Sequence, residues 1–568
     1  MIRGVIQDAI RESPLVLINT GSGRLVDKPG QASSFELLPI FHELVSSTTT
    51  EIDRHRIEDE VGHYYRYAMF SHKWEGNEPL FEEVMRVVVY ELEESLTHDK
   101  LQMFCKVVRD AGFHWAWSDT CCINKADSAV LQEALVSMFQ WYQGSSMTVV
   151  RLCDVFSPSR RGDLVRSIWN TRAWTFQEYH ASKVVLFYNS DWTLYRNLDV
   201  PNHKECPEII AEMEEATGIE SRALTAIRPG LENIRGKLHL ASTRQATRIE
   251  DSAYSLLGIF SLPLSIVYGE GDKALGRMLS QLLTSSGDTS ILAWTGRSGG
   301  FNSCFPARIS VYEQSPTSHI PPVVSRAMMD TITAALRSPP LNLASELVTR
   351  FYDQLRELPI PLCAGKRMKI PCVVFKLGLL SVSRVGSDRV FRAQTDGLGI
   401  VEINSGEDLS RSKSLCLVHP WIDFLLDQQP VGDAVEAIPE GKTDEESSTV
   451  QMSLSPGPSS NTLAAPELPT AWLSRFGLPF GGRTVTRDVP VSLRPPSTLT
   501  KTKKKMDAFR VLARLKQPFG ALLLTRDHGN VAAYRRVAAE SLVKVQVREI
   551  TPTVLNKLVE SVCVLDVL

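Results

Sequence analysis

Short apolar runs alternate with amphipathic stretches between residues 65 and 190, and this alternation predicts strands separated by helices. The expected strands are apolar runs that end at a polar residue or turn: Tyr67–Ser71, Phe113–Trp117, Met147–Leu152 and Val184–Tyr188. Helical spacing appears between them, in Leu101–Ala111 and again from Ser128, the expected N-cap, to about Gln143. Strands that alternate with helices in this way favour parallel β-α units, and therefore an α/β fold with a parallel sheet and flanking helices.

Several polar residues follow these runs directly. Ser71 and His72 end the first predicted strand, Asp119 follows the second, and Asp154 follows the third. Ligands of parallel α/β sheets bind at the carboxyl ends of the strands, which share one edge. The pattern therefore places these four residues on one rim of the predicted sheet.

The remaining chain divides by its pattern into further regions. Residues 1–62 are mixed and read as an N-terminal arm with one short strand, residues 63–190 form the α/β domain, and residues 191–300 look helical. Beyond them, 301–429 and 471–568 carry short β-prone runs, among them Phe509–Ala513, which predicts a β-rich C-terminal region. The lysine-rich run 501–505 (KTKKK) is expected to be a solvated loop and not a nucleic-acid site. The Pro-, Ser- and Glu-rich stretch 430–470 is expected to be a disordered linker, since it has too few apolar residues to form a core.

Composition narrows the class of protein. The chain has 568 residues, 43% of them hydrophobic, with a formal net charge of -3, so no overall charge favours nucleic acid. No apolar run reaches the 18 residues expected of a membrane span, and the first residues lack the apolar run of a secretory signal. A cytoplasmic protein is therefore expected.

The ten cysteines are irregularly spaced, with one adjacent pair at Cys121 and Cys122. No C-x₂₋₄-C pair is present, and adjacent side chains cannot comfortably share one tetrahedral ion. No metal site is therefore expected.

Three blocks between residues 67 and 178 resemble one known family. The segment from Tyr67 to Trp74 (YAMFSHKW) resembles a strand ending in Ser-His/Tyr-x-Trp-Gly, although here Glu75 separates Trp74 from Gly76. The segment from Trp117 to Lys125 (WSDTCCINK) is similar to a W-x-D-x-x-C-I-(N/D) block, and Thr171 to Glu178 (TRAWTFQE) to an R-x-W-T-x-Q-E block. In this order and spacing, they resemble the fungal heterokaryon-incompatibility (HET) domain, and the similarity continues to about residue 296.

The resemblance implies a fold and a function. HET domains are similar to TIR domains, so it implies a TIR-like, flavodoxin-like sheet, and a signalling module of heterokaryon (vegetative) incompatibility and programmed cell death. Such a module would act through protein partners or self-association and needs no cofactor. The alternative from another class is a TIR-like glycosidase that cleaves NAD as its substrate, and a third is an inert scaffold.

The resemblance to TIR domains also suggests candidate site residues. Glu178, four residues after Trp174, would be the catalytic carboxylate beside the ribose, whereas the structural alternative pairs Glu178 with Arg172 or Arg151. Ser71, His72, Trp74, Asp119 and Trp174 would surround the substrate, and Arg172 and Cys122 would serve the structure.

Each of the surrounding residues also has a structural interpretation. Asp119 at the rim could bind ribose hydroxyls or anchor its own loop, and the two tryptophans could pack instead of stacking on a base. Ser71 and His72 are neighbours on a strand, so they point to opposite faces and are not expected to form a nucleophile–base pair.

Overall fold

A computed structural model describes most of the chain. The described residues are 1–47, 53–218, 227–313, 342–385, 388–395, 398–405, 414–420, 501–517, 519–526, 533–538, 543–548 and 550–568, with isolated positions between them. The predicted linker at 430–470 lies outside these residues, so its disorder stays a prediction.

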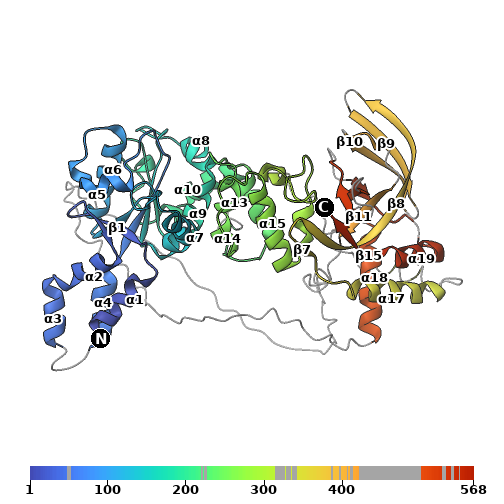
Figure 1. Cartoon of the computed structure of the whole chain (residues 1–568), viewed down its shortest axis with the longest axis horizontal. Helices are drawn as coiled ribbons and strands as arrows, with labels where there is room; N and C mark the ends of the chain where they lie inside the picture. The colour runs from blue at the N-terminus through green and yellow to red at the C-terminus, as the bar shows by residue number, and fades with distance from the viewer. Residues whose placement is uncertain are drawn as a thin grey trace, which may run out of the picture. The chain divides into compact units, whose positions relative to one another are not determined.

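The N-terminal half is built on a six-stranded mixed sheet with the order β2-β1-β4-β3-β5-β6 (Figure 1). The strands are β1 (Val16–Asn19), β2 (Leu25–Asp27), β3 (Tyr67–His72), β4 (Trp115–Trp117), β5 (Met147–Arg151) and β6 (Val185–Tyr188). β3 is parallel to β4 and β5, and β5 is parallel to β6. The predicted α/β fold is confirmed at this level, with the first two predicted strands as parallel interior neighbours.

The N-terminal arm adds to this sheet instead of standing apart from it. β1 pairs antiparallel with both β2 and β4, so the sheet is parallel in its centre and antiparallel at one edge. The sequence predicted the strand near residue 15 but not its place beside β4. The arm also holds four helices: α1 (Ile2–Arg11), α2 (Lys28–Glu36), α3 (Pro39–Ser47) and α4 (Arg54–Tyr64).

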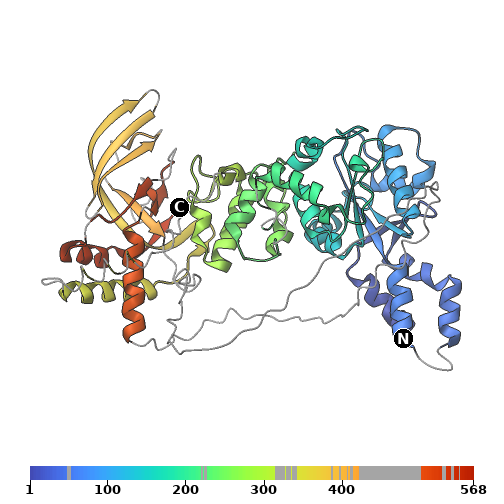
Figure 2. The ribbon, with the colours of Figure 1, turned by 180° about the vertical axis from the view of Figure 1, so that it is seen from behind.

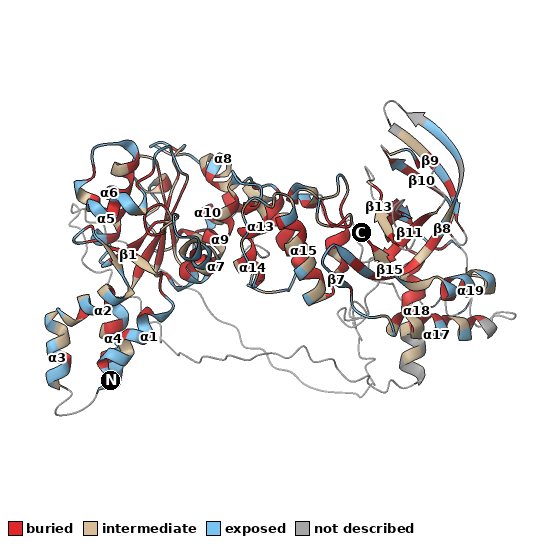
Figure 3. Ribbon diagram, viewed as in Figure 1, coloured by how far each residue is buried: buried red, intermediate tan, exposed pale blue. Residues whose placement is uncertain are grey.

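Helices separate and cover the parallel strands. They are α5 (Phe81–Arg86), α6 (Leu96–Asp110), α7 (Ser128–Gly144), α8 (Asp163–Arg166), α9 (Ala173–Ala181) and the short η1 (Val89–Glu91) and η2 (Ile168–Thr171). All residues of β3 and β4 are buried, as expected of central strands packed on both faces (Figure 3). Helix α7 begins at Ser128, but its N-cap is Asp127, whose carboxylate accepts from the amides of Ala129 and Val130.

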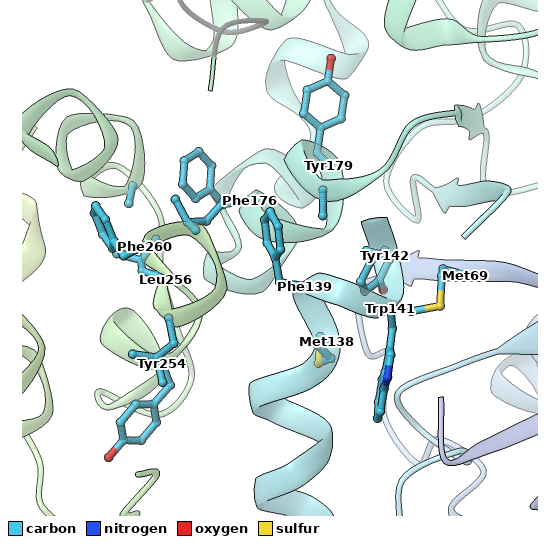
Figure 4. Packing of buried hydrophobic residues seen from close by; sticks show 14 of the residues in the cluster. Met69, Met138, Phe139, Trp141, Tyr142, Phe176, Tyr179, Tyr254, Leu256 and Phe260 are labelled. Atoms are coloured by element: carbon cyan, nitrogen blue, oxygen red, sulfur yellow. The ribbon is translucent and has the colours of Figure 1, made fainter. Parts of the chain in front are cut away.

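The next region is helical, as predicted. Its elements are η3 (Tyr195–Asn197), η4 (His203–Glu205), α10 (Pro207–Thr217), α12 (Ile234–Ser242), α13 (Asp251–Tyr254), α14 (Leu257–Phe260), α15 (Lys273–Ser286), η5 (Thr289–Leu292) and η6 (Ile309–Glu313). Its apolar side chains belong to the same buried cluster as those of the first sheet. Figure 4 shows the junction, where Phe139 of α7 lies among Phe176 of α9 and Leu256 and Phe260 of the extension.

The C-terminal region is β-rich, as predicted. Its strands are β7 (Leu362–Ala364), β8 (Arg367–Val385), β9 (Asp388–Thr395), β10 (Gly399–Ser405), β11 (Leu415–Pro420), β12 (Phe519–Arg526), β13 (Tyr534–Arg536), β14 (Val543–Val545) and β15 (Val562–Val567). They form a nine-stranded sheet in which β15 pairs with both β13 and β8, so that β8, β11, β12, β13 and β15 close into a ring. The long β8 bends along its length (Figure 2).

Among the described residues, three helices accompany this sheet: α17 (Asn342–Arg356), α18 (Lys501–Leu515) and α19 (Pro552–Glu560). α18 contains the run Phe509–Ala513, for which the sequence predicted a strand, and that prediction was wrong. The buried residues Ala508, Val511, Leu512 and Leu515 follow helical spacing, which decides the structure of this segment. The same helix begins at the lysine-rich run 501–505, which the sequence predicted as a loop.

Candidate functional site

Glu178 and Ser71 meet inside the first domain, although 107 positions separate them in the chain. Ser71 ends β3 and Glu178 lies on α9, and the hydroxyl of Ser71 donates to a carboxylate oxygen of Glu178 at 2.5 Å. Ser71 Oγ also accepts from the indole Nε1 of Trp169 at 2.8 Å. Ser71 therefore links the end of β3 to two elements that follow β5.

Burial dominates the electrostatics of Glu178. The residue is 7% exposed, and desolvation raises the pKa of its carboxyl to about 8, against the opposing effects of the Ser71 hydrogen bond and of Arg172 and Arg244. Among the described residues, no basic nitrogen lies within ion-pair distance of this carboxyl. The carboxyl is thus largely protonated near neutral pH. Its partner is the neutral hydroxyl of Ser71, whereas the structural alternative from the sequence was an arginine.

Arg172 and Arg244 hold the start of α9. The guanidinium of Arg244 donates to the carbonyl of Arg172 at 3.0 Å and to the hydroxyl of Thr175 at 2.9 Å. The backbone of Arg172 forms a bridge with Gln245, which joins this turn to the helical extension. Arg151 does not reach Glu178 and instead pairs with Glu75 at 2.6 Å. Arg172 thus contacts these elements through its backbone, and a structural role for its side chain stays a prediction.

His72 lies on the other face of β3 from Ser71, as strand geometry predicted. Its imidazole stacks on Phe70, with ring centroids 4.1 Å apart, and both ring nitrogens are buried without a hydrogen-bond partner in the structure. Nε2 is 3.9 Å from Glu78 and 4.0 Å from Asp119, beyond hydrogen-bond range. Burial, together with Lys100 and other nearby cations, lowers the pKa of His72 well below its usual value, so the imidazole is neutral.

A buried ion pair lies beside His72. Lys100 of α6 donates to Glu78 at 2.5 Å, and both side chains are almost completely inaccessible to solvent. Glu75 also lies 3.5 Å from Lys100 and connects it to Arg151 at the end of β5. This charge network joins α6 to the loop after β3 and to β5.

Trp74, Asp119 and Lys125 form a more exposed group at the same rim. The indole Nε1 of Trp74 donates to the carboxylate of Asp119 at 2.9 Å, and the ammonium of Lys125 lies 4.4 Å from the centroid of the Trp74 ring. Lys125 also donates to the carbonyls of Asp119 and Thr120. Trp74 is 36% exposed, so this group presents an aromatic ring and charged atoms to solvent.

The other two candidates, Trp174 and Cys122, are not part of this group. Trp174 is on α9 beside Asp251 of α13, so it faces the helical extension. Cys122 is buried in the loop after β4, where its sulfur accepts from the amide of Ser118 at 3.4 Å. The part of the chain that the structure describes holds no group of three His, Cys, Asp or Glu side chains suited to a metal ion.

Sequence reasoning missed two members of this arrangement. Trp169 stands two positions before the third block, and nothing in its spacing pointed to Ser71. Lys100 stands one position before the predicted helix Leu101–Ala111 and in the structure is part of that helix, α6, on which a lysine is normally solvated. A lysine on the apolar face of that helix was the available signal, since a fully buried lysine requires a partner.

Part of the chain is similar to known proteins. The sequence model described as "Heterokaryon incompatibility protein (HET)" matches residues 67–156. Over 227 residues, which is 38% of this chain, the sequence is 32% identical to the "Vegetative incompatibility protein HET-E-1" of Podospora anserina. The match spans 16% of the length of that relative. No solved structure matches the chain.

Two further findings bear on the class of protein. Within the described ranges, no helix has the length and apolar character needed to cross a membrane. The matched residues 67–156 include β3 to β5, with Ser71, His72, Trp74 and Asp119, so the match covers most of the rim. Residues 67–156 therefore carry the sequence of a heterokaryon-incompatibility (HET) domain, and the resemblance to that family is confirmed over this segment.

Proposed function

We propose that this chain is a signalling module of heterokaryon (vegetative) incompatibility that triggers programmed cell death in fungal non-self recognition. The observation that carries the proposal is the 32% identity over 227 residues to a protein named for vegetative incompatibility. That stretch is longer than the 67–156 matched by the family model, so the likeness includes sequence beyond this segment. Cytoplasmic action is part of the proposal.

The module acts through protein partners or self-association. The rim group of Trp74, Asp119 and Lys125 supports this mode, because exposed aromatic rings beside charged groups are common at protein interfaces. The net charge of -3 gives no support for a nucleic-acid partner.

A flavodoxin-like or TIR-like fold is also part of the proposal. The four parallel strands lie side by side in the order β4-β3-β5-β6. Numbered 1 to 4 in chain order from β3, they therefore have the spatial order 2-1-3-4. Flavodoxin-like sheets have this order, and their ligands lie where the strand order reverses. Ser71, His72 and Arg151 end the two strands at this point.

The NAD-cleaving alternative has less support from the site. A developing oxocarbenium ion requires a carboxylate anion beside the ribose, whereas Glu178 is buried, hydrogen-bonded to Ser71 and has a pKa of about 8. Incubating the purified full chain with NAD tests this point, and we expect no free nicotinamide above a protein-free control. Release that Glu178→Gln abolishes would establish the glycosidase instead.

Controlled expression in Podospora anserina tests the signalling function. Inducing the full chain should arrest growth and admit a viability dye within hours. Trp74→Ala should reduce killing at equal protein level, whereas Leu37→Ala, an exposed apolar residue after α2, should kill as the wild type does. Unchanged growth of cells that accumulate the folded wild-type chain would refute the proposal.

A further inference from the structure

Two cysteines of the C-terminal sheet face each other across a strand pair. β8 and β15 are antiparallel, and their register places Cys372 directly opposite Cys563. The thiol of Cys372 lies 3.6 Å from the carbonyl oxygen of Cys563, and the two thiols are close enough to shift each other's pKa in opposite directions. Opposed residues of an antiparallel pair have Cα atoms about 4.5–5.5 Å apart, within the range of about 4.4–6.8 Å that a disulfide spans.

We propose that Cys372 and Cys563 are an oxidisable pair that hydrogen peroxide or another peroxide converts into a disulfide between β8 and β15. Both thiols are free in the structure, so it represents the reduced form. The strand register places the two side chains opposite each other on one face of the sheet, at a Cα separation that a disulfide can span. This assignment is independent of the function proposed for the HET domain.

The two thiols have different roles in the reaction. Cys563 is half-buried, and interaction with the thiol of Cys372 lowers the pKa of its own thiol, so Cys563 supplies the reactive thiolate. Its sulfur attacks one peroxide oxygen, the O–O bond breaks, and a sulfenic acid and water are formed after protonation of the leaving oxygen. Cys372 is buried and acts second: its sulfur attacks the sulfenic sulfur, the S–O bond breaks, and a second water leaves with the thiol proton.

Nearby thiols provide internal controls. Cys416 on β11 is also buried, but its register partner on β8 is Lys376, so it does not oppose Cys372. Cys105, Cys121 and Cys122 are buried in the first domain, out of reach of an oxidant in solution. Cys153 and Cys363 are half-buried like Cys563, but burial raises the pKa of both thiols, so the reaction should favour Cys372 and Cys563 at low peroxide concentration.

The disulfide would secure a strand that contacts the helical extension. The carbonyl of Val567, at the end of β15, accepts from the side-chain amide of Asn302 at 3.0 Å. The cross-link closes a loop between residues 191 positions apart, and closing so long a loop restricts the unfolded chain strongly. Oxidation should therefore raise the melting temperature of the C-terminal region.

Peroxide treatment of the reduced full-length chain, followed by thiol blocking and peptide mass spectrometry without reductant, tests the proposal. We expect one linked peptide pair containing Cys372 and Cys563, cleaved by dithiothreitol, and a higher melting temperature. Cys372→Ser should leave a sulfenic acid at Cys563 that dimedone captures, with no cross-link and no rise in melting temperature. Cys416→Ser should form the cross-link as the wild type does.

Two outcomes would overturn the assignment. One is a folded wild-type chain that forms no Cys372–Cys563 peptide while dimedone labels other cysteines. The other is a cross-link from Cys563 to Cys416 or to a second chain. The wild-type experiment decides the matter by itself, so a variant that fails to fold does not weaken it.

Discussion

At the residue scale, the protonation of Glu178 gives a pH-dependent stability. The folded-state pKa of about 8 exceeds the value of about 4.3 for an unfolded glutamate, so the folded chain keeps a proton that the unfolded chain releases. The contribution of this bound proton to the free energy of unfolding is therefore complete below about pH 4. It is lost as pH rises through about 8, by roughly 1.4 kcal/mol per pH unit between these values.

Glu178→Gln should remove this dependence. The amide keeps the shape and can still accept from Ser71, so we expect stability within about 1 kcal/mol of wild type near pH 5 and greater than wild type near pH 8.5. Urea denaturation of wild type and variant at several pH values measures the free energy of unfolding at pH 5 and at pH 8.5. Glu58→Gln, on the exposed face of α4, should retain the wild-type pH slope. A loss of about 3–5 kcal/mol in Glu178→Gln at neutral pH would instead indicate an ionised, paired carboxylate.

A second residue-scale prediction concerns Lys100. Lys100→Met leaves the carboxylate of Glu78 buried without its cation, and we expect a loss of about 3–5 kcal/mol in the free energy of unfolding. Adding Glu78→Gln should restore part of that loss. Arg54→Met breaks a pair with Glu58 that is exposed on both sides, so it should change stability by less than about 0.5 kcal/mol. Equal effects of the two single changes would contradict the buried character of the Lys100 pair.

At the element scale, the sequence predicted the parallel strands and the polar residues at their ends. It did not predict the antiparallel edge that β1 and β2 add to the sheet. Each central strand is a short apolar run that ends at a polar residue, and this local signal placed Ser71, His72 and Asp119 correctly at strand ends. The pairing of β1 with β4 depends on contacts between residues about a hundred positions apart, which no local pattern encodes. Trp169 was missed for the same reason.

Another prediction was wrong because one apolar run is compatible with both strand and helix spacing. The run Phe509–Ala513 is rich in apolar residues and reads as a strand when taken alone. Ala508 and Leu515 extend the helical spacing on either side, and packing of that face makes the segment a helix. A short apolar run therefore needs its flanking residues before its type can be predicted.

The close approach of α14 to α7 gives a prediction at this scale. A Cβ atom on Gly258 would lie 2.2 Å from Cβ of Phe139, so Gly258→Ala should force the helices apart and cost about 1–3 kcal/mol or more. Gly62 in α4 has open space around its Cα, and Gly62→Ala should stabilise the chain by about 0.4–1 kcal/mol. Urea denaturation of both variants and of wild type measures their free energies of unfolding. An unchanged value for Gly258→Ala would contradict the close packing of α14 on α7.

At the scale of the whole molecule, Arg536 connects the C-terminal sheet to the helical extension. Its guanidinium donates to the carbonyls of Leu292 and Trp294 and lies 3.7 Å from the centroid of the Trp294 ring. The side chain is buried, and burial lowers its pKa to about 10. One planar group thus satisfies two carbonyls at the end of the extension while packing on an aromatic face.

Arg536→Met should therefore loosen this connection and leave the HET domain folded. Both carbonyls lose their donor, and each buried unpaired group costs about 1–3 kcal/mol. We expect faster hydrogen exchange at amides of η5 and β13, with β3 and β5 unchanged. Arg535→Met is the matched control, because the neighbouring Arg535 is partly exposed and pairs with Glu407, and it should leave η5 unaffected. If exchange in η5 stays at the wild-type rate in Arg536→Met, the extension is held by its apolar contacts alone, and the guanidinium adds nothing to the link between the two regions.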